Sequence, residues 1–366
     1  MEKAKAKLRI TSLETEYKPR LYNGSIQEEH DALVALMNSE AIISIVDTYA
    51  DQARELELVR DSSKIGQLPP LPSRQELGEI EKGMWVYYPW KKTLVHVLNE
   101  NEYEELRTSR NKNLITKDEQ DKFRNARIAV AGLNVGNPGA LCIVLEGGSK
   151  NIKFADFDPL SVSNLNRFRA GLCELEINKA TLSARQALEI DPYMNIEVYE
   201  KGITPENINN FLTDPKVDLI IEEMDNLKLK ILMRDKAREF RVPLIMVTGN
   251  SENVIIDVER YDIDTDLLVL NGYLKQEVID SINNINKDAT LTDRVLLARD
   301  FIGKDFLTQR LQQSFLEVGK SLASIPQLSE SSFLRGAVLG YVARQILTGE
   351  QMPSGRFSVN LSDIAK

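Results

Sequence analysis

A set of charged side chains in the middle of the chain has the types needed to handle a nucleoside triphosphate. Its members each follow an apolar, strand-like segment or open the next helix, and they are Asp156, Asp158, Arg167, Lys179 and Asp225. An arginine and a lysine neutralise phosphate oxygens, while a carboxylate can hold Mg²⁺. Hydride transfer with a nicotinamide cofactor has no use for this combination. The set therefore favours ATP as the bound nucleotide.

A segment with two glycines precedes these side chains, and it reads Ala131-Gly132-Leu133-Asn134-Val135-Gly136-Asn137-Pro138. Such a segment between a strand and a helix is typical of phosphate binding. Asn134 and Asn137 stand where a GxGxxG loop has glycine, but asparagine tolerates positive φ better than other side chains do. We expect Asn137 to cap a helix that begins at Pro138, with its free N–H groups facing an anion. Taken alone, the segment fits NAD, FAD, ATP or a purely structural turn.

Alternating strands and helices must position these residues. Strands are predicted at 127–131, 151–155, 195–199, 217–221 and 244–247, and helices at 138–146, 176–190 and 227–240. This order indicates βαβ units, so we expect an α/β fold with a Rossmann-like, mainly parallel sheet and helices on both faces. Asp156 follows the second strand, where an acidic side chain can accept hydrogen bonds from ribose hydroxyls.

The chain divides into two predicted parts. Residues 1–104 are expected to form a small α+β module that contains a helix opened by a capping box at Ser25–Glu28, a helical stretch over 41–60, a proline-rich connector at Leu68–Ser73 and a hairpin over 84–98. The hairpin carries Trp85 and Trp90, and we interpret it as a hydrophobic contact with the main domain or as a peptide-binding surface. Residues 105–366 hold the nucleotide-binding core, 127–260, and a helical extension, 262–366, with an apolar helix at 334–347 and a last strand at 356–361.

Composition excludes several classes of function. The formal charge of −9 lacks the basic excess that nucleic acids or an anionic membrane would attract, so neither is an expected partner. Two cysteines and two histidines, far apart in sequence, cannot supply a typical zinc site, and we expect structural roles for Cys142 and Cys173. No targeting segment or run of about 18 apolar residues is visible, which makes a cytoplasmic location the expectation.

The chemistry-bearing motifs together resemble the superfamily of ThiF, MoeB and the ubiquitin-activating enzymes. Arg127–Asp158 is similar to the first βαβ unit of that family, Ser163–Arg167 to its signature, Asn178-Lys179 to its lysine and Met224-Asp225-Asn226 to its Thr-Asp-Asn. The resemblance covers residues 105–260 well, and the final helix and strand more loosely. It implies adenylation of a carboxylate, usually at the C-terminus of a peptide or small protein, by ATP and Mg²⁺ with release of pyrophosphate.

The same resemblance implies roles for individual residues. Asp156 would bind the ribose, Arg167 and Lys179 the phosphates, and Asp225 would hold magnesium and position the α-phosphate. The remaining nucleotide contacts would come from Gly132, Asn134, Gly136, Asp158, Asn164, Asn166 and Asn226. Arg110, with Arg107 as the alternative, would reach the nucleotide of a partner subunit, which implies a homodimer. A solvated or salt-bridged arginine is an equally good interpretation of this position.

Two departures from the family narrow the expected function. The chain has no CxxC pair and no cysteine after residue 173, so the family's zinc site and a thioester relay are not expected. A peptide-tailoring enzyme of the microcin type, with the N-terminal module binding a leader peptide, fits these departures. Two alternatives remain open: a scaffold subunit that is not catalytic, and an NAD(P)-dependent oxidoreductase. The residues do not identify the carboxylate or the acceptor nucleophile.

Overall fold

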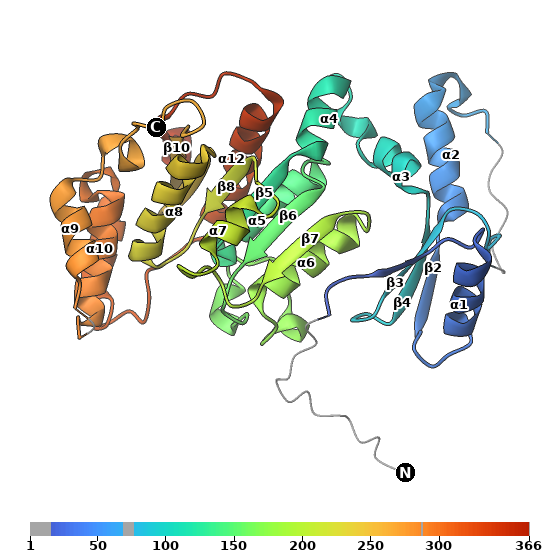
Figure 1. The fold of residues 1–366 in the computed structure, drawn as a ribbon, viewed down its shortest axis with the longest axis horizontal. Helices are drawn as coiled ribbons and strands as arrows, with labels where there is room; N and C mark the ends of the chain where they lie inside the picture. The colour runs from blue at the N-terminus through green and yellow to red at the C-terminus, as the bar shows by residue number, and fades with distance from the viewer. Residues whose placement is uncertain (1–15, 69–76, 287, 366) are drawn as a thin grey trace, which may run out of the picture.

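The protein folds around two β-sheets that lie side by side, as the computed structural model in Figure 1 shows. The structure describes residues 16–68, 77–286 and 288–365. A four-stranded sheet belongs to the N-terminal module, and a seven-stranded sheet forms the centre of the rest of the chain. Within these residues, none of the helices is both long and apolar enough to cross a bilayer.

The N-terminal sheet has the strand order β1-β3-β4-β2. The elements of this module are β1 (Arg20–Tyr22), α1 (Gln27–Met37), β2 (Ser44–Asp47), α2 (Tyr49–Arg60), β3 (Met84–Tyr88), β4 (Thr93–Val97) and α3 (Glu100–Arg107). Strands β3 and β4 pair antiparallel, which confirms the predicted hairpin. Strand β2 adds to β4 in the parallel direction and leaves its own outer edge at the end of the sheet.

The hairpin and the residues after it connect the module to the main domain. Trp90 donates from Nε1 to Glu189 Oε1 at 2.5 Å, and the Tyr88 hydroxyl donates to the carbonyl oxygen of Leu188 at 3.0 Å. Trp85 instead lies in the core of the module, stacked on the His96 ring with the centroids 4.0 Å apart. The interpretation of the hairpin as a contact with the main domain is therefore confirmed for Trp90 but not for Trp85.

The seven-stranded sheet has the order β11-β10-β9-β8-β5-β6-β7. Its strands are β5 (Arg127–Ala131), β6 (Asn151–Ala155), β7 (Asn195–Tyr199), β8 (Leu219–Glu222), β9 (Leu244–Asn250), β10 (Asn253–Glu259) and β11 (Gly355–Val359). Strands β5 to β9 are parallel, while β10 and β11 run antiparallel at one edge. The expected Rossmann-like, mainly parallel sheet is confirmed. Ligands bind such sheets at the carboxyl ends of the parallel strands.

Helices cover both faces of this sheet, as expected. The helices of the main domain are α4 (Lys117–Asn125), α5 (Leu133–Leu145), α6 (Lys179–Ile190), α7 (Ile208–Thr213), α8 (Leu227–Phe240), α9 (Gln276–Asn284), α10 (Leu291–Ile302), α11 (Gln309–Glu317) and α12 (Ser329–Thr348). Apolar side chains of α5, α6 and α12 pack into one core cluster with the sheet, and those of α7 and α8 into another. Helices α9 and α10 extend the domain beyond α8 (Figure 1).

Helices α5 and α12 approach each other closely because glycines lie at their contact. A Cβ atom on Gly336 would lie 2.9 Å from the carbonyl oxygen of Pro138, and one on Gly340 would lie 2.7 Å from Cys142 Sγ. Any larger side chain would push the helices apart. This contact fixes the start of α12 beside the first helix of the nucleotide-binding core.

A buried ion network joins β8, α8 and β10. Arg234 Nη1 lies 2.7 Å from Glu222 Oε2, and Arg234 Nε lies 2.9 Å from Glu259 Oε2. All three side chains are fully buried. Lys230 also pairs with Glu222, and the Tyr261 hydroxyl donates to Glu259 at 2.7 Å. The network holds the carboxyl end of β8 against α8, where Asp225 follows.

Two predictions for the N-terminal module differ from the structure. Helix α1 begins at Gln27 after Ile26, and no side chain caps it, because the Ser25 hydroxyl donates to Asn23 instead. The stretch 41–60 is not one helix, since β2 precedes α2; β-branched Ile45 and Val46 suit the added strand. Most of the connector at 68–73 lies outside the described residues.

The helix after β5 also starts earlier than predicted. Helix α5 begins at Leu133 rather than Pro138, with Gly132 as its N-cap residue. The Asn137 side chain is buried and donates to Ser183 and Gln186, so it is not a helix cap facing a ligand. Pro138 is the sixth residue of α5, past its first turn, and cannot donate to the carbonyl oxygen of Asn134 as another residue there would.

We expect Arg234→Met to lower the free energy of unfolding by about 3–5 kcal/mol, because Glu259 would lose its cation in the interior. Urea denaturation measures this change. Lys236→Met on the same helix is the control, because Lys236 pairs with Glu239 near the surface and its loss is expected to cost less than about 1 kcal/mol. Equal effects of the two substitutions would contradict the importance of the network.

Candidate functional site

The predicted nucleotide-binding residues meet at the carboxyl ends of β5, β6 and β8. Gly132 follows β5, Asp156 follows β6, and the Glu223–Asn226 turn follows β8. Parallel pairing of β5 with both other strands brings these three turns to the same edge. The structure therefore brings these residues, which the sequence singled out, together at one edge of the sheet.

Gly132 lets the chain turn sharply between β5 and α5. Its φ is 88°, and a Cβ atom there would lie 2.3 Å from the carbonyl oxygen of Glu223. No other residue type fits this position without moving the turn after β8. The glycine thus holds two turns of the site in contact, in addition to leaving room for a ligand.

Asp156 fastens the start of α5 to the end of β6. Its Oδ2 accepts from the backbone N–H of Leu133 at 2.7 Å, and its Oδ1 accepts from the N–H of Asp158 at 2.9 Å. Burial raises the pKa of this carboxyl. Each oxygen of a carboxylate has a second lone pair, so ribose hydroxyls could still donate to Asp156. The Asp156 side chain can therefore position the helix terminus and contact a nucleotide at the same time.

Lys179 and Asp158 form the next part of the site. Lys179 is the first residue of α6, after the cap Asn178, and its Nζ lies 3.1 Å from Asp158 Oδ2. The lysine is only 4% exposed, and the carboxylate of Asp158 is about half exposed. A lysine held at this edge beside one carboxylate can contact a phosphate oxygen with little loss of side-chain freedom.

Arg167 contacts the glycine-containing segment through Asn134. The amide oxygen of Asn134, oriented toward the guanidinium, accepts from Arg167 Nη2 at 2.9 Å. Arg167 Nη1 donates to the carbonyl oxygen of Ser163 at 3.0 Å and to Asn166 Oδ1 at 2.8 Å. Burial lowers the pKa of Arg167, and the negative charge of Asp225 opposes that shift. Asn134, which stands where a GxGxxG loop has glycine, thus orients Arg167.

The other asparagines mainly shape the turns. Asn164 Oδ1 accepts from the N–H of Ser161 at 3.1 Å, Asn166 Nδ2 donates to the carbonyl oxygen of Gln327 at 3.0 Å, and Asn226 caps α8 through the N–H of Leu229 at 3.2 Å. These contacts place the three residues around the site. Their predicted contacts with a nucleotide stay predictions.

Asp225 lies at the surface of the site, exposed to solvent between β8 and α8. Among the described residues, no group of three or more His, Cys, Asp or Glu side chains could hold a metal ion by itself. Mg²⁺ in nucleotide sites usually takes one or two carboxylates and completes its shell with phosphate oxygens and water. The single carboxylate of Asp225 fits that mode of binding, and it does not fit a zinc site.

Arg110 does not join the site of its own chain. It is exposed, and the neighbouring Asn111 donates to the carbonyl oxygen of Glu146 at 2.8 Å, just past the C-terminal end of α5. The site lies at the other end of this helix, about 20 Å away at 1.5 Å per residue. Arg107 is held by Asp191 and by the carbonyl oxygen of Val144, so it has a structural role.

Neither cysteine forms a disulfide. Cys142 packs against Gly340 in the contact of α5 with α12, and burial raises the pKa of its thiol to about 11. That thiol is therefore protonated and unreactive at neutral pH, as expected for a structural residue. Cys173 is exposed.

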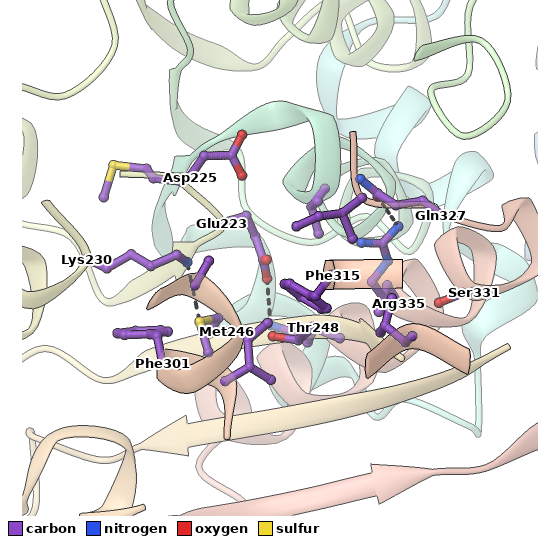
Figure 2. A pocket seen from close by; sticks show the side chains of 18 of the residues that line it. Glu223, Asp225, Lys230, Met246, Thr248, Phe301, Phe315, Gln327, Ser331 and Arg335 are labelled. Carbon is purple, nitrogen blue, oxygen red and sulfur yellow. Dashed lines mark hydrogen bonds between the residues drawn. The ribbon is translucent and has the colours of Figure 1, made fainter. Parts of the chain in front are cut away.

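A cavity that the sequence did not reveal opens beside Asp225. Figure 2 shows Glu223 and Arg335 on its walls, with Met246, Phe301 and Phe315 around them. Glu223 Oε1 accepts from the N–H of Val247 at 2.6 Å, and burial raises the pKa of this carboxyl to about 8. The acidic pair Glu222-Glu223 at the end of an apolar strand was a signal for this residue. Arg335 gave no signal, because it lies in an apolar helix.

Comparison with known proteins agrees with this geometry. The model of the ThiF family matches residues 108–260. An uncharacterised protein of Mycobacterium tuberculosis is 32% identical over 92% of this chain and 44% of its own length. The molybdopterin-synthase adenylyltransferase of Haemophilus influenzae is 30% identical over 35% of this chain and 52% of its own. The chain thus spans about half the length of these relatives.

Among solved structures, a crystal structure of PaaA is similar over 72% of this chain and 77% of its own. The sequence identity is 17% and the TM-score is 0.49. At that score the similarity is too partial to say anything about a substrate.

We expect Glu223→Gln to change how stability depends on pH. Folded Glu223 has a pKa of about 8 against 4.5 as the ordinary value, so the folded chain keeps a proton that the unfolded chain loses between these pH values. Stability of the wild type therefore falls as pH rises from about 4.5 to about 8. Glutamine stays neutral and can still accept from Val247. We compare the free energy of unfolding of the variant with that of the wild type at each pH. The difference, variant minus wild type, should be larger at pH 9 than at pH 5 by at least about 1 kcal/mol.

Thermal unfolding at the two pH values measures this difference. Glu277→Gln, on the exposed face of α9, is the control and should follow the wild type at both. Parallel pH curves for Glu223→Gln and the wild type would contradict a raised pKa.

Proposed function

Because residues 108–260 of this chain belong to the ThiF family, we propose that the protein is an ATP-dependent adenylyltransferase that activates a carboxylate. The observation that carries this proposal is the meeting of Asp156, Arg167, Lys179 and Asp225 at one edge of the sheet. Two cations and two carboxylates at the strand ends match the parts of Mg·ATP. An oxidoreductase would need no such set.

The proposed reaction is a displacement at the α-phosphorus of ATP. An oxygen of the substrate carboxylate forms a bond to the α-phosphorus, the bond to the oxygen bridging to the β-phosphorus breaks, and Mg²⁺ pyrophosphate leaves with that oxygen. Magnesium would neutralise charge on the phosphates. Asp225 would hold the ion, Arg167 and Lys179 would stabilise the phosphate oxygens, and Asp156 would orient the ribose. Such a reaction needs placed charge and orientation more than a protein nucleophile.

The proposed substrate is a peptide or small protein with an activatable carboxylate. The N-terminal module supports this, because β2 is an edge strand of its sheet and Ile45 and Val46 on it are 37% and 41% exposed. An extended peptide can add to such an edge through main-chain hydrogen bonds. The buried, protonated Cys142 offers no thioester relay, so the acyl-adenylate would pass directly to the acceptor.

ATP–pyrophosphate exchange with candidate peptides tests the proposal. Asp225→Asn should lower the exchange rate by about 10²-fold or more, because magnesium and the α-phosphate lose their carboxylate. Asp280→Asn on α9 is the matched control at an exposed carboxylate and should keep the full rate. An unchanged rate in Asp225→Asn, or no binding of Mg·ATP to the wild type in calorimetry, would contradict the proposal and favour a scaffold subunit.

We also propose that the protein is a homodimer in which Arg110 serves the site of the partner subunit. Arg110→Ala and Asp225→Asn should then each be inactive alone. A mixture that exchanges subunits should regain up to about a quarter of the wild-type exchange rate, because half of the dimers are mixed and each mixed dimer contains one intact site of two. Light scattering gives the oligomeric state. A mixture that stays inactive although its subunits exchange would contradict the role of Arg110.

A further inference from the structure

The cavity beside Asp225 lies between the sheet and the helical extension. It has a volume of about 170 Å³, and its lining comes from the ends of β8 and β9 and from α10, α11 and α12. Most of its wall is apolar, with Met246, Phe301, Leu311, Phe315 and Ile325 around it (Figure 2). Because Asp225 also lines it, the cavity opens where the proposed α-phosphate would lie.

Two cations line this wall, Lys230 and Arg335, and Lys230 is paired with Glu222. The Arg335 side chain is 3% exposed, yet it forms no ion pair with any residue that the structure describes. Its Nη2 donates to Gln327 Oε1 at 3.2 Å, while its buried Nε has no hydrogen-bond partner within the described chain. A buried guanidinium in this state is costly unless an anion completes its hydrogen bonds.

The surroundings of Arg335 raise that cost. Burial lowers the pKa of Arg335 to about 10, and the charges of Arg167 and Arg169 add to that shift against the opposing charge of Glu223. Glu223 lines the same cavity, but its Oε1 accepts from the N–H of Val247. Arg335 is also held in place, since Gly336 next to it packs on Pro138. The site is therefore preorganised for an anion.

The size of the cavity limits what can accompany that anion. A cavity of about 150 Å³ lined by leucine, isoleucine and phenylalanine holds benzene, so this one has room for a single aliphatic or aromatic side chain. One terminal amino acid could make both contacts. Its carboxylate would pair with Arg335, and its apolar side chain would lie against Phe301 and Phe315. A terminal glycine would leave the apolar wall without a contact.

We propose that this cavity binds the terminal residue of the substrate, and that this residue carries an aliphatic or aromatic side chain. Arg335 pairs with its carboxylate and holds it at the mouth of the cavity, facing the site of Asp225. This inference rests on the proposed adenylation and names the substrate class for that site. In it Arg335 is a substrate-binding residue, and the cavity wall sets specificity.

Binding of small probes to the full chain without nucleotide tests the cavity directly. The probes are N-acetyl-L-phenylalanine, its amide, which lacks the carboxylate, and N-acetylglycine, which lacks the side chain. Saturation-transfer NMR titrations suit their weak binding. We expect N-acetyl-L-phenylalanine to bind about tenfold more tightly than either other probe. Equal binding of all three, or binding of none, would overturn the inference.

Substitutions locate the binding. Arg335→Met and Arg335→Gln should each weaken binding of N-acetyl-L-phenylalanine about tenfold, while binding of its amide, which has no carboxylate to pair with Arg335, changes less. Ala298→Phe should fill the cavity from α10 and exclude the aromatic probe without removing any charge. Arg310→Met, at an exposed position of α11, is the control for loss of an arginine and should bind as the wild type does. Wild-type affinity in Ala298→Phe and both Arg335 variants would overturn the inference.

Exchange assays separate this inference from the proposed function. The peptides for this assay differ only in their last residue, which is Phe, Leu or Gly. The value of kcat/KM should be about tenfold lower for the peptide ending in Gly than for the other two. Equal rates for all three would overturn the specificity while leaving adenylation intact. Binding of N-acetyl-L-phenylalanine that depends on Arg335, together with an absence of exchange for every peptide, would support the cavity and contradict adenylation.

Discussion

The site depends on a buried ion network centred on Arg234, between Glu222 of β8 and Glu259 of β10. Buried charges are costly unless they are paired with good geometry, so the network tolerates few arrangements of β8, α8 and β10. Glu222 also accepts from the backbone N–H of Met224 at 2.9 Å, which bends the chain as it leaves the strand. That bend brings the carbonyl of Glu223 against Gly132 and leaves Asp225 at the surface of the site. One interior interaction therefore sets the geometry of the proposed magnesium ligand.

Around the same site, three cations are incompletely paired. Arg167 hydrogen-bonds to amide and carbonyl oxygens, Arg335 has no ion-pair partner among the described residues, and Lys179 shares one half-exposed carboxylate. This contrasts with the charge of −9 for the whole chain. Since desolvated cations bind anions strongly, these incompletely paired cations suit a polyanionic nucleotide and a carboxylate held together. The charges of the interior network are paired with one another, whereas these cations can still bind ligands.

The sequence predicted the parts of the fold that local patterns specify. Short apolar strands alternating with helices gave the parallel sheet, and the hairpin of aromatic and β-branched residues formed as expected. Two predicted helix starts differ from the structure. Ser25 was predicted to cap a helix, but its hydroxyl donates to Asn23 instead. Asn137-Pro138 was predicted to start a helix, but α5 begins five residues before Pro138. There Asp156, distant in sequence, takes the first N–H of the helix and so decides where it starts.

The sequence by itself determined which charged side chains gather at this edge of the sheet, because Asp156, Arg167, Lys179 and Asp225 follow strands whose carboxyl ends must meet in a parallel sheet. Only the tertiary structure decided the cavity. Glu223 follows β8, Phe301, Phe315 and Arg335 come from α10, α11 and α12, and no spacing along the chain relates them. They meet because glycines let α12 pack closely on α5, which carries Arg335 to the end of the sheet. Close packing of helices, and the burial of charge that comes with it, is a property of the folded chain and not of any segment.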